Sequence, residues 1–185
     1  YGGIYLDTDV EVIKSFDDLL SLPYFIGQEK KENIEAAVFG AEKGTDWLAD
    51  CLKYYDNRPF IKNDGNLDLI ILPRIMKAQI EVKRELIPMG KNEVDKIHQL
   101  IKDKTKLMLF SFKYFSANNF ETHKASITKD TYSVHHFNNA WVPFKMKFKL
   151  NLKRTIIKIF GNKLTDTLIG YSGFRTAKKI FKHNN

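Results

Sequence analysis

The sequence predicts a domain of α/β class followed by basic amphipathic helices. Segments in which apolar and polar residues alternate, as in strands, are interspersed with segments whose apolar residues recur every three or four positions, as in helices. No internal repeat is present, and 43% apolar with 28% charged residues over 185 positions is the composition of a globular chain. At this level an α+β arrangement of the same elements stays open.

The first part of the chain predicts strands and one short helix. Apolar and polar residues alternate from Ile4 to Ile13, which predicts a single strand. Phe16–Leu22 carries acids in its first turn and ends before Pro23, which predicts a short helix. Two further apolar segments predict strands at Tyr24–Gln28 and Ala36–Ala41.

The middle of the chain predicts two helices on either side of a loop. Apolar residues from Asp46 to Tyr55 form one stripe of an amphipathic helix. Residues 57–66 form a loop, and Leu67–Ile80 is again helical in pattern, with Pro73 expected to kink or restart it. The remaining segments predict strands at Glu85–Met89, Lys106–Phe112 and Thr131–Phe137 and a helix at Glu93–Lys104.

Residues 144–185 carry the positive charge of the chain. They hold eleven Lys or Arg and one acid, a net charge of +10, whereas residues 1–143 have a net charge of −2. Their apolar residues follow an amphipathic rhythm, so this segment could lie on an anionic membrane surface, where each Lys or Arg contributes about 1 kcal/mol. It could equally dock on the body with its lysines in water. We expect 1–143 to be the catalytic portion and 144–185 a separate tail.

The composition and the start of the chain limit the possibilities further. Cys51 is the only cysteine, which excludes an intrachain disulfide and a cysteine-based zinc cluster and fits a reducing, cytoplasmic compartment. No apolar run reaches the roughly 18 residues that a spanning helix needs. The chain begins at Tyr1 and its first methionine is Met76, so we expect an N-terminal truncation.

The motif most suited to catalysis or metal binding is Asp7-Thr8-Asp9. In a strand both carboxylates lie on one face, with Glu11 next along it. Mg²⁺ and Mn²⁺ take a few oxygen ligands from protein and the rest from water or phosphate. Such a cation stabilises the charge that develops on a departing diphosphate. An isolated D-x-D is also common on solvated edge strands. The residues around it must therefore show whether it belongs to a metal site.

Two other classes of D-x-D protein fit the neighbours less well. An EF-hand loop starting at Asp7 needs Gly and Glu where the chain has Val12 and Asp18, which excludes it. A phosphatase of the haloacid dehalogenase type continues with Gly and then Thr or Val, where the chain has Val10 and Glu11. No later acidic pair resembles that family's second metal motif, so it remains an alternative only.

Two segments together resemble one family. Tyr1–Glu11 resembles, nearly residue for residue, the G-G-x-Y-x-D-x-D signature of the sugar transferases of glycosyltransferase family 32, which include capsular-polysaccharide and initiating mannosyltransferases. About 125 residues later, Tyr132–Trp141 resembles the H-H-[FW]-x-x-S-W element of the same group. Two motifs in this order are more specific than either alone, and the resemblance spans roughly residues 1–142.

The resemblance implies the C-terminal part of a GT-A-type nucleotide-diphospho-sugar transferase domain. It implies that Asp9 ligates Mn²⁺ or Mg²⁺ and that Asp7 contacts the sugar or ribose and helps to hold the metal. Tyr5 would lie beside the nucleotide. His135 would complete the metal site, and neutral imidazole suits Mn²⁺. Adjacent side chains of a strand point to opposite faces, so only one of His135 and His136 can face the metal, and we favour His135.

The rest of the second motif concerns the donor. Trp141 would cover the diphosphate with its indole N–H available as a donor. The family's serine is replaced by Ala140, which removes a hydroxyl. Asn138 or Asn139 would have to supply that contact instead.

The implied reaction is transfer of a hexose from a nucleotide-sugar donor to a hydroxyl of a glycan or lipid-linked oligosaccharide, with retention, in cell-surface polysaccharide synthesis. The base and ribose pocket of this group lies upstream of its D-x-D, so we expect the 185-residue stretch alone to be inactive and poorly folded. We expect a cytoplasmic protein, held at the inner membrane face if the tail binds lipid. The alternative function is a membrane- or nucleic-acid-binding module that uses the basic tail. Nucleic acid is the less favoured of these partners, because the aromatic residues of the tail suit one apolar face better than exposed stacking platforms.

Overall fold

The computed structural model describes residues 1–29, 33–90, 93, 96–118 and 125–138, and residues 148, 151, 152, 155, 156 and 159. The chain divides into two compact units, Tyr1–Asn119 with Ala125–His136, and Phe120–Lys124 with Phe137–Asn185. All strands and helices named below belong to the first unit. The predicted boundary between residues 143 and 144 falls outside the described residues, so it stays a prediction.

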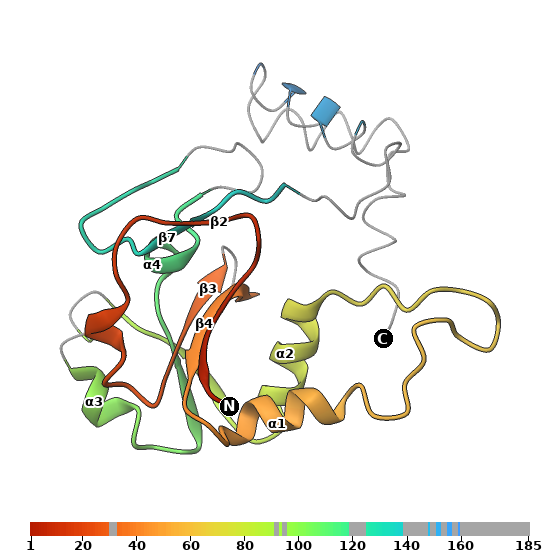
Figure 1. Ribbon diagram of the computed structural model, residues 1–185, viewed down its shortest axis with the longest axis horizontal. Coiled ribbons are helices and arrows are strands. Elements are labelled where there is room, and N and C mark those ends of the chain that lie inside the picture. Colours follow the sequence, from red (N-terminus) through yellow and green to blue (C-terminus); the bar gives the residue numbers. More distant parts are fainter. Residues whose placement is uncertain are drawn as a thin grey trace. The chain divides into compact units, whose positions relative to one another are not determined.

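A three-stranded antiparallel sheet and a two-stranded parallel sheet, linked by an isolated bridge, form the centre of the first unit (Figure 1). Strand β4 (Asn33–Ala41) pairs antiparallel with β1 (Gly3–Leu6) on one side and with β3 (Tyr24–Glu29) on the other. Strands β5 (Glu85–Pro88) and β6 (Lys106–Leu109) pair in parallel. Beyond β6, the Phe110 N–H donates to the carbonyl of Ile26 at 2.9 Å and its carbonyl accepts from Gln28 at 2.8 Å, so β3 and β6 are neighbours.

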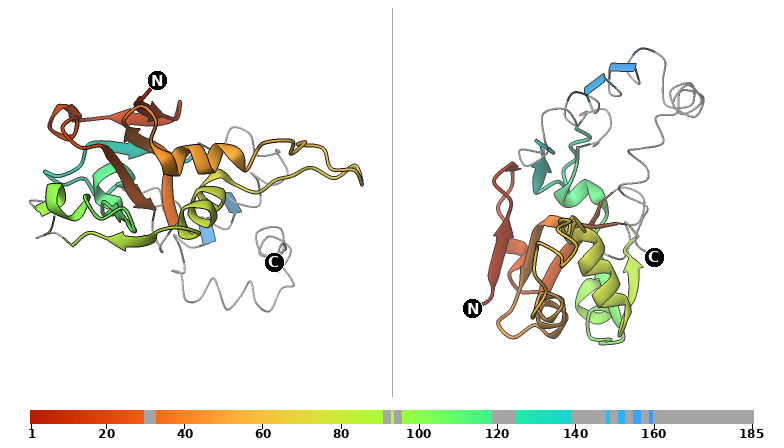
Figure 2. Two further views of the ribbon diagram at one scale, coloured as in Figure 1. Left: turned by 90° about the horizontal axis from the view of Figure 1, so that it is seen from below. Right: turned by 90° about the vertical axis from the view of Figure 1, so that its right-hand side faces the viewer.

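Helices α1 (Asp46–Lys53) and α2 (Leu72–Glu81) lie side by side, and α2 packs next to β4 (Figures 1 and 2). Successive side chains of a strand point to opposite faces, so neighbouring residues of β3 pack into two different hydrophobic clusters. Ile26 packs with the helices and Phe25 with a cluster of aromatic rings. The helical core is built from Ile26, Ile34, Ala36, Trp47, Cys51, Met76, Ile80, Leu107 and Leu109.

The observed helices are shorter than the patterns predict. The segment predicted as helix from Leu67 becomes helical only at Leu72, and Pro73 lies in the first turn, where its missing N–H is not needed. Pro73 therefore starts the helix and does not kink it. Of the helix predicted at Phe16–Leu22, only a 3₁₀ turn forms, η1 (Asp17–Leu19). Among the described residues of the helix predicted at Glu93–Lys104, only Ile97–Leu100 form an α-helix, α3.

Two remaining elements frame the candidate site. The prediction of strand to Phe112 is wrong at its end, because α4 (Phe112–Phe115) begins there. Strand β7 (Ser133–His135) pairs antiparallel with β2 (Val10–Val12), which is separate from β1. The chain between β1 and β2 is the D-x-D motif.

Candidate metal centre

Residues 7–9 form a turn, and the prediction of one continuous strand from Ile4 to Ile13 is wrong. The Asp7 N–H still bonds the Ala37 carbonyl of β4 at 2.9 Å, but the Val10 N–H bonds back to the Asp7 carbonyl at 3.1 Å. From Val10 onward the chain pairs with β7 in place of β4. The physical reason is this change of partner strand, which an alternating sequence pattern does not record. The two carboxylates therefore project from a turn.

The turn brings both aspartates to His135. One ligand atom each of Asp7, Asp9 and His135 can be chosen so that all three lie within 4.8 Å of one another. His135 Nε2 is 3.5 Å from Asp9 Oδ1, and the two side chains are 13% and 19% exposed. Such a group could hold a metal ion with one face open to solvent.

The pairing of β2 with β7 decides which histidine faces the aspartates. Val10 lies opposite His135, and the His136 N–H donates to the Asp9 carbonyl at 3.0 Å. The His136 ring lies 2.9 Å from Glu11 Oε2, and both of these side chains are exposed. The structure thus brings His135 to the D-x-D turn and sends His136 and Glu11 elsewhere.

A buried acid that the sequence reasoning missed lies behind His135. Glu35 of β4 is 2% exposed, and its Oε1 accepts the Ala37 N–H at 2.9 Å and lies 3.3 Å from His135 Nδ1. Among the described residues, Glu35 Oε2 has no hydrogen-bond partner. The available signal was one acid inside the apolar stretch from Ile34 to Val38.

These acids alter the protonation of their neighbours. Burial by itself lowers the pKa of His135, but the contact with Glu35 and the charges of Glu35, Asp9 and Asp7 outweigh it, so its pKa is raised. Burial, with the charge of Glu35, raises the pKa of Glu29 to about 7, against the influence of His135. The site is therefore a strongly negative environment around one imidazole.

Tyr5 contacts the site directly. Its hydroxyl donates to Asp7 Oδ1 at 2.5 Å, and its ring stacks on Phe39 with centroids 5.1 Å apart. The hydrogen bond to Asp7, burial and the Asp7 charge together raise the pKa of Tyr5 to about 12. Tyr5 thus orients one of the carboxylates and leaves an exposed ring face beside it.

Of the residues expected to contact the donor, Tyr5 and Asp7 lie in this group, whereas the described structure does not place those of the second motif beside it. Asn138 is exposed and belongs to the second unit, whose placement relative to the first is not described. Trp141, Asn139 and Ala140 lie outside the described residues. Their predicted roles stay predictions.

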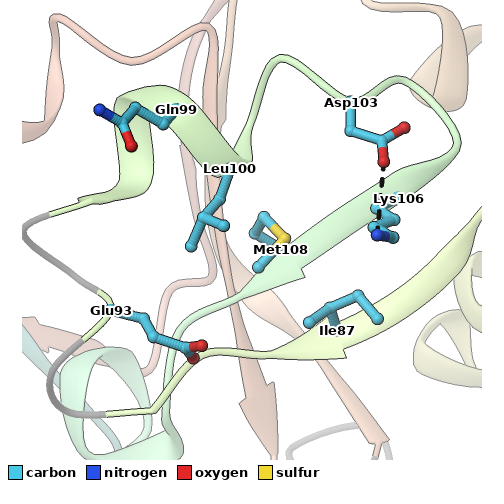
Figure 3. A pocket seen from close by; sticks show the side chains of 7 residues that line it. All are labelled: Ile87, Glu93, Gln99, Leu100, Asp103, Lys106 and Met108. Carbon is cyan, nitrogen blue, oxygen red and sulfur yellow. Dashed lines mark ion pairs between the residues drawn. The ribbon is translucent and has the colours of Figure 1, made fainter.

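A cavity of about 240 Å³ lies elsewhere in the first unit, over β5 and β6 beside α3 (Figure 3). Its floor is apolar, and the charged groups at its edge form hydrogen bonds or ion pairs with neighbouring residues. Glu93 Oε2 accepts the Gly90 N–H at 2.7 Å, and Asp103 accepts from Thr105 and pairs with Lys106 at 3.4 Å. This cavity contains none of the residues of the candidate metal centre.

In comparisons with known proteins, no family model, curated protein or solved structure matches the chain. In the part of the chain that the structure describes, no helix combines the length and the apolar character needed to cross a membrane.

Proposed function

We propose that the chain is part of a metal-dependent glycosyltransferase of GT-A type that moves a hexose from a nucleotide sugar to a hydroxyl of a glycan. The observation that carries this proposal is the meeting of Asp7, Asp9 and His135. These residues come from the two ends of the first unit and from the two sequence motifs that resemble the sugar transferases. A chance D-x-D on a solvated strand has no reason to meet a histidine of a second motif.

The donor set fits Mn²⁺ or Mg²⁺. Two carboxylates and one neutral imidazole are few enough to leave positions for water and phosphate oxygens, and Mn²⁺ accepts nitrogen as well as oxygen ligands. A bound cation would neutralise the charge that develops on the leaving diphosphate. Asp9 and His135 would hold the cation, and Tyr5 keeps Asp7 in a fixed orientation beside them.

The proposed transfer breaks the bond between the anomeric carbon and the diphosphate oxygen, and the electron pair leaves with the diphosphate. The acceptor hydroxyl oxygen forms the new bond to the anomeric carbon, and its proton passes to the leaving diphosphate or to solvent. No described side chain is assigned as a covalent nucleophile. The partly exposed position of Asp7 and Asp9 leaves the donor's diphosphate free to approach them from solvent.

The first prediction concerns Asp9. Asp9→Asn keeps the size of the side chain but removes the charge that a cation needs, so Mn²⁺ affinity should fall by at least the roughly 10- to 100-fold typical of losing an outer-shell partner. Calorimetric titration with MnCl₂ measures this, and in the full-length enzyme a screen of nucleotide-sugar donors with Mn²⁺ should show turnover only with Asp9 present. In Asp17→Asn, the same exchange at an exposed acid of η1, both properties should match the parent. Unchanged Mn²⁺ affinity in Asp9→Asn would remove the basis of the proposal.

A further inference from the structure

We propose that Glu35 is the positioning residue of the metal centre: it binds Nδ1 of His135 and thereby directs Nε2 toward Asp9. This inference rests on the proposed metal site and adds to it a residue outside both sequence motifs. Glu35 is not one of the three residues whose ligand atoms meet. It contacts His135 on the other ring nitrogen, so it acts through the histidine.

The imidazole of His135 lies between two carboxylates. Nδ1 is 3.3 Å from Glu35 Oε1, which is an ion-pair distance without the alignment of a hydrogen bond, and Nε2 is 3.5 Å from Asp9 Oδ1. A neutral imidazole has one N–H donor and one acceptor nitrogen, and an ionised carboxylate only accepts. If Nδ1 donates to Glu35, the lone pair of Nε2 is left facing Asp9, where a cation needs it. Carboxylates that hold the far nitrogen of a ligating histidine in this way set its tautomer and its basicity.

Glu35 is itself held rigidly. Its Oε1 accepts the Ala37 N–H at 2.9 Å, and the Ala37 carbonyl accepts the Asp7 N–H at 2.9 Å. Ala37 of β4 therefore contacts both the acid behind His135 and the backbone of the D-x-D turn. A shift of β4 would move the two halves of the site together.

The burial of Glu35 argues against a merely structural role. Its side chain is 3% exposed, and Oε2 lacks a hydrogen-bond partner among the described residues. Burying a carboxylate oxygen without a partner costs free energy, so an apolar residue at this position of β4 would serve the fold better. The acid is explained if its function is to bind His135.

The chain contains a matched control pair two residues from Asp9. Glu11 and His136 also form a Glu–His contact, here a hydrogen bond of 2.9 Å, but both side chains are exposed. Glu11→Gln therefore makes the same chemical change to a Glu–His pair without touching His135.

The test measures the tautomer of His135 directly in the metal-free protein. Long-range ¹H–¹⁵N NMR spectra at alkaline pH, where the ring is neutral, distinguish a proton on Nδ1 from one on Nε2. The parent should show His135 protonated on Nδ1. Glu35→Ala should lose this preference, Glu35→Gln should keep it because its side-chain carbonyl can accept, and Glu11→Gln should leave His135 unchanged.

Titration with MnCl₂ supplies the second readout. Glu35→Ala should weaken Mn²⁺ binding by about 10- to 100-fold, the usual effect of losing an outer-shell partner, with a smaller loss in Glu35→Gln. A parent protein whose His135 carries its proton on Nε2 would overturn the inference whether or not any variant folds. So would a folded Glu35→Ala chain with parental tautomer and Mn²⁺ affinity. Absence of sugar transfer by the full-length enzyme, with these results intact, would count against the proposed function alone.

Discussion

At the scale of single residues, the first unit concentrates acids around one imidazole. Asp7, Asp9 and Glu35 all lie near His135, and Glu29 is close enough to Glu35 for their charges to interact. Without a cation this arrangement is electrostatically unfavourable, because like charges at short range in a partly buried site raise the energy of the ionised state. The protein tolerates the cost at one place, which is where we propose that a cation binds.

Glu29 makes this cost measurable through the pH dependence of stability. Its pKa is about 7 in the folded chain against 4.5 for an unperturbed carboxyl, so the folded state binds the proton more tightly than the unfolded state. The parent should therefore lose free energy of unfolding as pH rises from 4.5 to 7, by at most about 3 kcal/mol, since each pKa unit is worth 1.36 kcal/mol. Glu29→Gln cannot ionise and should not show this loss.

Urea denaturation of both proteins at pH 5 and pH 8 checks this expectation. Glu29→Gln should be the more stable protein at pH 8, with a smaller advantage at pH 5. Glu81→Gln, an exchange at an exposed acid of α2, should follow the parent at both values. Parallel pH dependence in Glu29→Gln and the parent would show that Glu29 ionises normally in the folded chain.

The residues of the site differ in how far the sequence could predict them. Asp7, Asp9 and His135 stand in motifs whose residue types and order carry information, so they could be proposed from the sequence. Glu35 has no motif. Its role depends on the antiparallel pairing of β4 with β1 and on the contact with β7, which are long-range pairings that no local pattern encodes.

At the scale of elements, β4 organises both the core and the candidate site. Gly40, near its end, lies against the ring of Phe25 on the neighbouring strand β3. A Cβ at Gly40 would approach Phe25 Cε1 to 2.3 Å. The ring cannot move aside easily, because it packs between Phe16 and Phe115 at centroid distances of 5.6 and 5.5 Å.

Gly40→Ala should therefore destabilise the chain by about 1–3 kcal/mol, the usual cost of overpacking a core. Urea denaturation measures the loss, and a double-mutant cycle tests its cause. In a Phe25→Leu background the same exchange should cost less, because the smaller side chain leaves room for the new methyl group. Equal costs in both backgrounds would assign the destabilisation to the backbone of β4.

Element boundaries were less predictable than element types. The apolar stripe identified α1, and the apolar segments identified β3 to β6, because burial imposes a period on the sequence. The ends of elements depend on partners. The alternation from Ile4 to Ile13 runs unbroken through a turn, since β1 and β2 both alternate but pair with different strands. The positions of Asp7 and Asp9 on a turn follow from this change of partner strand, which the sequence pattern does not show.

At the scale of the whole molecule, charge is divided unevenly along the chain. Residues 1–143 have a net charge of −2 and include the acids of the candidate site, whereas residues 144–185 carry +10. The overall charge of +8 therefore describes the tail and says little about the site. A cation attracted to Asp7 and Asp9 responds to the local field of the acids, which falls off within a Debye length of about 8–10 Å in physiological salt.

The tail, most of which lies outside the described residues, gives the last prediction. If it binds an anionic membrane, exchanging Lys145, Lys147 and Lys149 for Gln should weaken binding to phosphatidylserine-containing vesicles by about 3 kcal/mol, or roughly 100-fold, since each lysine contributes about 1 kcal/mol. Sedimentation with anionic and with neutral vesicles measures this, and added salt should weaken only the anionic case. The matched control makes the same exchange at three lysines of the first unit, Lys53, Lys62 and Lys77. Equal loss in the control would show a response to net charge alone, and binding to DNA with a steep salt dependence but not to vesicles would favour a nucleic-acid partner.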